Sequence, residues 1–187
     1  MPVRVVLGAS VLADARVRDV VLAFAEDGLY QPYWSDGVIA EVDRRLPAEL
    51  PRPARDYLFA ELDRAFPDAR VTWPATVLRE VPYVVDPRDT HLTAVALIAH
   101  ADAVVTTDSA IAAALERSGI EPWTPDAFVT FVVDADPARA RATLLRMVRR
   151  RWLPGTDETD DALLSRVVTW ARRALGDSCA DLLACGN

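Results

Sequence analysis

One segment, Val84–Asp108, constrains the fold more strongly than any other part of the sequence. Its middle, Leu92–Ala99, carries apolar residues on every side of a helix, which predicts a helix enclosed by the fold rather than lying on its surface. Ala103–Thr106 is rich in apolar and β-branched residues and predicts a short strand. A helix of about 11 residues rises about 16 Å, and a strand of about 5 residues covers a similar distance back. Asp89, which begins the helix, and Asp108, just past the strand, therefore return to one edge of the fold.

Each of these two aspartates also has an ordinary structural explanation. Asp89 would cap the free N–H groups of the helix and interact with its dipole. Asp108 would be a turn residue after the strand. Their shared edge favours a functional explanation, because ligands and catalytic groups of open parallel sheets gather at the carboxyl ends of the strands. Together the two acids predict half of a metal site.

Strand and helix patterns alternate over the first 130 residues. Further strands are predicted at Val3–Leu7, Arg70–Trp73 and Ile120–Trp123. The apolar spacing also predicts helices around Val17–Phe24, after a Ser35 cap up to Leu46, around Ala54–Phe66 and over Ser109–Arg117. This alternation predicts an α/β fold with a parallel sheet flanked by helices.

Beyond residue 130 only helical patterns continue. Asp136 and Pro137 begin a helix that Pro154 and Gly155 end, and a last amphipathic helix covers residues 163–175. We expect a domain over residues 1–130 and a C-terminal helical extension over residues 131–187. The apolar face of the last helix must dock on the core or on another chain.

Glu41 lies in the predicted helix after Ser35. The apolar arc of this helix consists of Val38, Ile39, Val42 and Leu46, and at 100° per residue Glu41 falls about 60° outside the arc. That position is near the boundary of the core, so the side chain either points into a cleft or lies on a solvated surface.

The charge balance excludes a generally basic nucleic-acid coat. The formal net charge of the 187 residues is -7, although a local patch is still compatible with nucleic-acid binding. All 21 basic residues are arginine, a bias typical of GC-rich genomes. Arg16 and Arg18, expected in the loop after the first strand, are candidates for holding a substrate phosphate. A second arginine cluster would attract nucleic-acid phosphates or an acidic partner, or would complement a helix dipole; it comprises Arg146, Arg149, Arg150 and Arg151.

Two further features bear on the compartment. The N-terminal apolar run is short, carries Arg4 and is broken by Gly8, so it predicts a strand rather than a signal peptide. No window has the length of a membrane span, and we expect a soluble, cytoplasmic protein without membrane contact. Cys179 and Cys185 match no common zinc spacing and are expected to be ordinary thiols.

Four short stretches carry acids, or positions where acids are expected, in a characteristic order. They are LGAS at Leu7–Ser10, WSDGVIAEV at Trp34–Val42, DPRDTHLTA at Asp86–Ala94 and TTD at Thr106–Asp108. In this order they resemble the PIN-domain ribonucleases, especially the VapC-like toxins of bacterial toxin-antitoxin pairs, over residues 1–130. The resemblance implies a PIN-like parallel sheet and a site that includes Glu41, Asp89 and Asp108.

The resemblance also exposes a gap. Gly8 stands where the family's first aspartate is expected, and glycine offers neither a charge nor a metal-binding oxygen. A natural loss of activity and a substitution introduced so that a toxic nuclease can be produced both fit this glycine. Because Mg²⁺ is often held by only one or two protein carboxylates, some binding would survive. We expect this chain to bind divalent metal poorly and to cleave RNA slowly or not at all.

The family's chemistry assigns a role to each candidate residue. Clustered carboxylates repel one another, and a bound Mg²⁺ or Mn²⁺ relieves that repulsion while keeping water in its shell. By resemblance, Asp89 and Asp108 hold the metal directly or through water, and Glu41 orients or deprotonates a water. Ser10 and Thr106 would orient the acids through hydrogen bonds.

Three functions stay open. The first is a metal-dependent endoribonuclease, with RNA as substrate and, by resemblance, a small antitoxin protein as partner. The second is a non-catalytic PIN-fold module that binds RNA or a protein. The third, an α/β small-molecule or phosphoryl-transfer protein, is disfavoured because the sequence has no glycine-rich phosphate loop. An exposed apolar face on a peripheral helix would favour a homodimer.

Overall fold

The structure is a computed structural model that describes residues 2–72 and 90–185. Contacts divide the chain into two compact units. The α/β unit comprises residues 1–14 and 31–123, and the helical unit comprises residues 15–30 and 124–187. The division expected near residue 130 stays a prediction.

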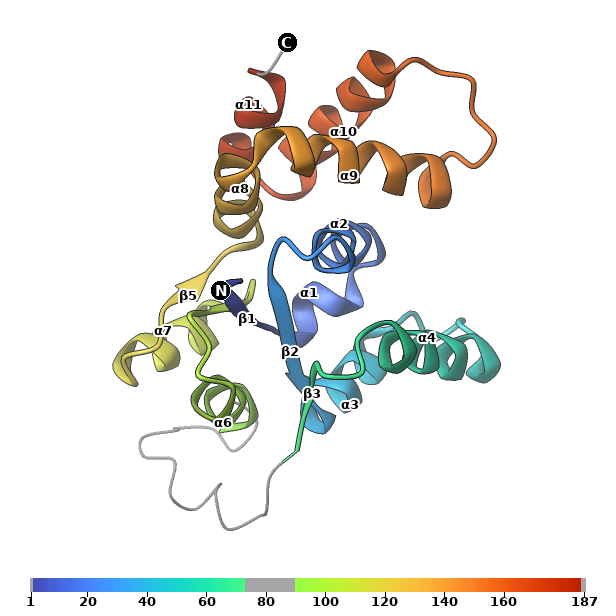
Figure 1. Ribbon diagram of the computed structural model, residues 1–187. Coiled ribbons are helices and arrows are strands. Elements are labelled where there is room, and N and C mark those ends of the chain that lie inside the picture. The colour runs from blue at the N-terminus through green and yellow to red at the C-terminus, as the bar shows by residue number, and fades with distance from the viewer. Residues whose placement is uncertain (1, 73–89, 186–187) are drawn as a thin grey trace. The chain divides into compact units, whose positions relative to one another are not determined.

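The α/β unit is built on a sheet of five parallel strands, as the alternating patterns predict. The strands run in the order β3-β2-β1-β4-β5 (Figure 1). The order turns at β1, whose two neighbours are β2 and β4, and the ends of β1 and β4 therefore flank a topological switch point. The bounds are β1 (Arg4–Leu7), β2 (Gln31–Ser35), β3 (Arg70–Val71), β4 (Ala103–Val105) and β5 (Pro122–Trp123).

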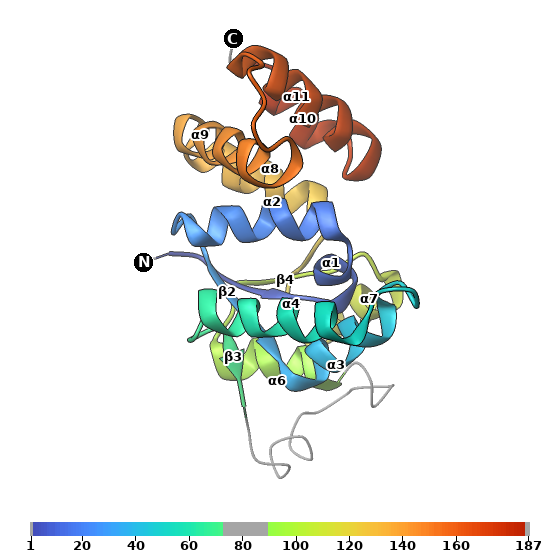
Figure 2. The same ribbon diagram turned by 90° about the vertical axis from the view of Figure 1, so that its right-hand side faces the viewer.

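Local signals explain the helices of this unit. Ser35 accepts a hydrogen bond from the Val38 N–H at 3.1 Å and so caps α3, as expected from the sequence. α3 and α6 contact each other on one face of the sheet, and α6 packs on β1 and β2 (Figure 2). The helices are α1 (Ala9–Ala13), α3 (Asp36–Arg45), α4 (Arg52–Ala65), α6 (Thr90–Ala99) and α7 (Ser109–Arg117).

Helix α6 is less enclosed than its sequence predicts. Its Leu92, Ala94 and Val95 are buried with the strands. Leu97 and Ile98, however, are 48% and 37% exposed. The expectation of an apolar helix enclosed on all sides is therefore wrong for one face, because the sheet covers only the opposite one.

Strand β2 contains Pro32, which a strand with neighbours on both sides rarely tolerates because proline lacks an N–H group. The N–H of Trp34 is directed toward the β3 side, where it donates to the Ala69 carbonyl at 2.9 Å. Pro32, two residues earlier, faces the same side. Since β3 begins at Arg70, the register partner of Trp34, no strand lies opposite Pro32 and no ladder bond is lost.

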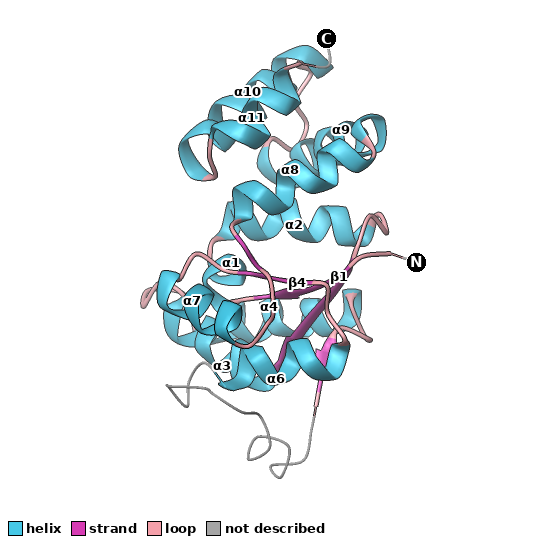
Figure 3. Ribbon diagram, turned by 90° about the vertical axis from the view of Figure 1, so that its left-hand side faces the viewer, coloured by secondary structure: helices cyan, strands magenta, loops and turns pink. Residues whose placement is uncertain are grey.

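The helical unit joins an N-terminal helix to the C-terminal part of the chain. α2 (Ala15–Glu26) packs on α8 (Pro125–Ala135) and α9 (Pro137–Met147). α9 continues into a π-helical turn, η1 (Val148–Trp152). The remaining helices are α10 (Asp160–Ala174), which packs on α9 and α11, and α11 (Asp177–Ala184), which also packs on α8 (Figure 3). The C-terminal helices thus dock on a helix of their own chain.

The described residues also bear on the membrane and cysteine predictions. Over residues 2–72 and 90–185, none of the helices combines the length and the apolar character that crossing a bilayer requires. Cys179 is buried, Cys185 is exposed, and both are free thiols. Burial, reinforced by the neighbouring Asp126, raises the pKa of the Cys179 thiol to about 12, so this thiol is an unreactive core group.

Candidate functional site

The carboxyl ends of β1 and β4 are joined by hydrogen bonds. Gly8, directly after β1, donates its N–H to the Val105 carbonyl at 2.8 Å. Ser10, in the first turn of α1, accepts a hydrogen bond at its Oγ from the Thr107 N–H at 3.1 Å. The two contacts bring Gly8 and Ser10 beside the loop that carries Asp108. Residues 97 positions apart in the sequence thereby form one end of the sheet, as adjacent parallel strands require.

Asp108 is the N-cap of α7, a structural role that differs from the turn residue considered in the sequence analysis. Its Oδ1 accepts hydrogen bonds from the Ala110 N–H at 3.0 Å and the Ile111 N–H at 3.2 Å. The buried Thr106 hydroxyl accepts the Asp108 N–H at 3.1 Å and shapes the loop. Within the described ranges, Oδ2 of Asp108 has no hydrogen-bond partner. The cap therefore fixes the carboxylate through one oxygen and leaves the other for a ligand.

Gly8 occupies a position whose backbone suits any L-amino acid, with φ of -72° and ψ of 159°. The surrounding space is tighter. A Cβ atom at this position would lie 3.0 Å from the Val105 carbonyl oxygen and 3.5 Å from the Thr106 Cβ. A side chain here requires a shift of a few tenths of an ångström, and it would emerge beside Thr106 at the start of the Asp108 loop.

Glu41 is carried by α3, whose neighbour α1 begins directly after Gly8. Its side chain is 25% exposed, in keeping with a place at the core boundary. The carboxylate binds Arg45 one helical turn later, with 2.8 Å from Nε and 2.6 Å from Nη2 to Oε1. Arg45 was not singled out by the sequence patterns, although the i,i+4 spacing of opposite charges is a signal that finds such pairs.

The remaining candidate acid, Asp89, lies outside the described residues. Among residues 2–72 and 90–185, no three His, Cys, Asp or Glu side chains gather closely enough to share a metal ion. Glu41 and Asp108 alone fall short of a carboxylate cluster, and Gly8 adds no donor. The described donor set therefore does not fit a complete Mg²⁺ or Mn²⁺ site.

The two hydroxyl groups expected to orient the acids act on backbone instead. Ser10 and Thr106 accept hydrogen bonds from the N–H groups of Thr107 and Asp108. They fix the backbone of the loop that carries Asp108 and do not contact its carboxylate through these hydrogen bonds. Their proposed role in orienting carboxylates directly stays a prediction.

Arg16 and Arg18 lie in α2 and not in a loop, so the predicted local structure of this pair is wrong. The apolar spacing of Val17, Val20 and Val21 continues the helix through both arginines. The Arg16 guanidinium lies over the Trp152 ring, 4.9 Å from its centroid. Both residues belong to the helical unit. Their proposed role in phosphate binding stays a prediction.

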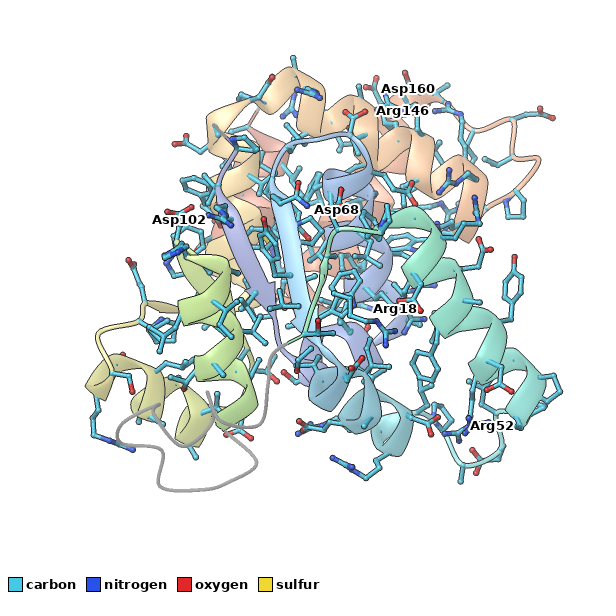
Figure 4. All side chains as sticks on the ribbon, turned by 60° about the horizontal axis from the view of Figure 1, so that its bottom comes forward. Arg18, Arg52, Asp68, Asp102, Arg146 and Asp160 are labelled. Atoms are coloured by element: carbon cyan, nitrogen blue, oxygen red, sulfur yellow. The ribbon has the colours of Figure 1, made fainter. Side chains whose placement is uncertain are left out.

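The second arginine cluster is paired with acids of its own unit. Arg146 binds Asp27 at 2.9 Å, and Arg149 binds Asp160 at 2.7 Å; Arg146 and Asp160 are labelled in Figure 4. The other contacts are Arg150 with Glu26 at 2.8 Å and Arg151 with Asp19 and Glu26 at 3.4 Å each. Most of these pairs join the end of α9 and η1 to α2, so the cluster has a structural role in ion pairing; the expected interaction with a helix dipole stays a prediction.

Comparison with known proteins identifies the α/β part of the chain. The family model described as "PIN domain" matches residues 4–110, which is more than half of the 187 residues. The match covers Gly8, Glu41, Asp89 and Asp108. No curated protein and no solved structure matches the chain.

Proposed function

Because the chain belongs to the PIN-domain family, a family of nucleases, we propose that it is a metal-dependent endoribonuclease whose activity is impaired by Gly8. The observation that carries the proposal is the junction between β1 and β4. The bond from Gly8 N–H to the Val105 carbonyl places position 8 beside the loop of Asp108. An aspartate at position 8 would therefore add its carboxylate to the edge where Asp108 already stands.

In this proposal, Asp108, Asp89 and Glu41 have different roles in the hydrolysis of an RNA phosphodiester bond. A divalent Mg²⁺ or Mn²⁺ ion, when bound, supplies an activated water and stabilises charge on the phosphate. Asp108, which caps α7 through Oδ1, would hold the ion through its second oxygen, and Asp89 would supply a further carboxylate. Glu41 orients or deprotonates the attacking water. Its salt bridge with Arg45 restrains its rotamer.

The test compares RNA cleavage by the chain and by two variants at position 8. Gly8→Asp adds a Cβ and a carboxylate, whereas Gly8→Ala adds only the Cβ that approaches the Val105 carbonyl. We expect Gly8→Asp alone to cleave single-stranded RNA, in Mg²⁺ or Mn²⁺ and not in EDTA. Equal activity of both variants and the unchanged chain would refute the assignment of position 8.

A second candidate, a non-catalytic PIN-fold module that binds RNA or a protein, is favoured by one observation. Among the described residues, no three acidic side chains form a cluster that could bind a metal ion, and Glu41 forms a salt bridge with Arg45. For such a module, Mn²⁺ titration would release no measurable heat even after Gly8→Asp. A disabled nuclease would regain a saturable heat signal in the same experiment.

We propose a VapC-like role, in which a small antitoxin protein binds the chain and keeps it inactive in the cytoplasm, and in which Arg16 and Arg18 contact substrate phosphates. Leu97 and Ile98 on α6 supply an exposed apolar face that supports a homodimer. Elution as a monomer at micromolar concentration would contradict the dimer.

A further inference from the structure

The helical unit contains a basic and aromatic pocket, and Arg16, a proposed phosphate contact, is one of its lining residues. Its volume is about 470 Å³, within the range of about 300–1,000 Å³ typical of small-ligand sites. Arg16, Arg166 and Arg173 line it together with Trp152 and Trp170. Among the residues that the structure describes, no Asp or Glu lines this pocket. Such a concentration of positive charge favours an anionic ligand.

The pocket follows from the two faces of α10. Leu163, Leu164 and Val167 are buried in the unit. Arg166, Trp170 and other polar residues recur at spacings of three and four on another face, and this face forms one wall. η1 supplies Trp152, whose ring meets that of Trp170, and α2 supplies Arg16. The polar and aromatic face of α10 therefore lines the pocket.

The two tryptophans are held in fixed positions. Their rings meet edge to face, with centroids 5.0 Å apart and planes at 70°. The Trp152 indole N–H donates to Asp19 at 3.0 Å, while the Arg16 guanidinium lies over the Trp152 ring. The Trp152 ring is thus occupied on one face, and Trp170 is the indole that remains for a stacking ligand.

The arginines differ in availability. Arg166 is bound by both oxygens of Glu158, at 2.8 Å each. Arg173 is exposed and, as far as the described chain shows, has no acidic or hydrogen-bonding partner. Its neighbour Arg172 is paired with Asp177 and Asp181 outside the pocket. Arg173 is therefore the guanidinium most available to an incoming phosphate.

We propose that this basic-aromatic pocket binds one nucleotide of single-stranded RNA, with the base stacked on Trp170 and a phosphate bound by Arg173. The choice of RNA rests on the proposed function, whereas the site rests on the pocket residues alone. Aromatic stacking combined with an arginine-bound phosphate is how proteins hold single strands without reading their sequence. An acidic peptide would satisfy Arg173 but would offer no ring to Trp170.

The test measures binding of a fluorescently labelled, single-stranded 2′-O-methyl RNA decamer, which resists cleavage, to the full chain. We expect Arg173→Ala to raise Kd about tenfold and to reduce the slope of log Kd against log salt concentration by about 0.7, the value for one lost phosphate contact. Arg172→Ala removes the same charge one residue away and is the matched control. It should change neither quantity.

The stacking contact is tested at Trp170. Trp170→Ala should weaken decamer binding about tenfold, and Trp170→Phe, which keeps a ring, should weaken it less. Circular dichroism of both variants checks that the unit folds. Equal effects of Arg173→Ala and Arg172→Ala, or equal binding of duplex RNA of the same length, would overturn the proposal.

Failure of the pocket and failure of the nuclease give different results. If Gly8→Asp cleaves RNA but Arg173→Ala leaves the decamer Kd unchanged, the pocket proposal is wrong and the nuclease stands. If Arg173→Ala weakens decamer binding but Gly8→Asp never cleaves, the pocket is supported and the nuclease proposal fails.

Discussion

The α/β unit and the helical unit use charged side chains in opposite ways. In the helical unit, the arginines from Arg146 to Arg151 meet carboxylates and hold helices together. In the α/β unit, one carboxylate oxygen of Asp108 caps α7, and the other oxygen has no partner among the described residues. A dense charge cluster in a sequence therefore does not by itself mark a binding surface. What matters is whether the fold leaves any of the charge uncompensated.

The largest expected effect separates the cap role of Asp108 from its metal role. Asparagine caps helices as well as aspartate does but carries no charge. In a Gly8→Asp background, we expect Asp108→Asn to reduce metal-dependent RNA cleavage at least about 100-fold. Thermal unfolding should stay within about 1 °C, because the cap survives. Retained cleavage would show that Asp108 is only a cap.

The next effect tests the packing of the helical unit at Gly176. A Cβ atom there would lie 2.7 Å from the Asp126 carboxylate, which accepts the Cys179 N–H at 2.9 Å and so anchors α11. Gly176→Ala should lower stability by about 1–2 kcal/mol, measured by urea unfolding. In the Asp126→Ala background the same change should cost much less, because the clash is gone. Equal costs in both backgrounds would contradict the predicted clash.

A smaller effect concerns the acid dependence of the same unit. The Thr143 hydroxyl, at 2.6 Å, and the guanidinium groups of Arg146 and Arg139 hold the pKa of Asp27 below its ordinary value of 3.8, against the opposing effect of burial. A carboxyl with a lowered folded-state pKa stabilises the protein above its unfolded-state pKa of about 3.9 and loses that contribution as the pH falls through the folded-state value.

Asp27→Asn should therefore lower stability at pH 7 by about 1 kcal/mol. The loss should shrink as the pH falls below the unfolded-state pKa of about 3.9 and through the lower folded-state pKa, where Asp27 of the unchanged chain becomes protonated. Urea unfolding at pH 7 and pH 3 measures both values. A difference between chain and variant that is constant with pH would contradict the role of the Asp27 charge.

The smallest expected effect tests whether the paired arginines take part in RNA binding. Arg150 is 61% exposed in its pair with Glu26, and such surface pairs contribute at most about 0.5 kcal/mol because solvent screens them. Arg150→Ala should leave urea unfolding nearly unchanged. It should also leave the Kd for the RNA decamer unchanged, unlike Arg173→Ala. An equal increase of Kd in both variants would show that the paired cluster binds RNA as well.

Helices that begin with a clear capping residue could be predicted from the sequence. Helices that depend on packing between distant parts of the chain could not. The Ser35 cap and the Asp136-Pro137 start predict α3 and α9 correctly, because caps act within one helical turn. α8 was missed because its β-branched and aromatic run favours a strand by propensity. Its buried residues instead recur at helical spacing, and packing in the unit overrides the propensity.

The candidate site shows the same division. The alternating strand and helix patterns predict where its strands end, and the resemblance to the PIN domain indicates which acids belong to the site. The partners of those acids depend on tertiary geometry: Ser10 reaches the backbone of Thr107, and Gly8 reaches Val105, across about 97 residues of sequence. No pattern within one strand or helix encodes such contacts. For the same reason, the pocket at Trp170 has no sequence signature.

The most direct test of the central claim, that position 8 is the missing ligand of a PIN-type metal site, is Mn²⁺ binding followed by electron paramagnetic resonance. The unchanged chain, Gly8→Asp and Gly8→Ala are titrated under identical conditions. We predict that Gly8→Asp binds Mn²⁺ at least about tenfold more tightly than the other two, because a third or fourth carboxylate completes the site. Equal Mn²⁺ affinity of Gly8→Asp and Gly8→Ala would contradict the claim.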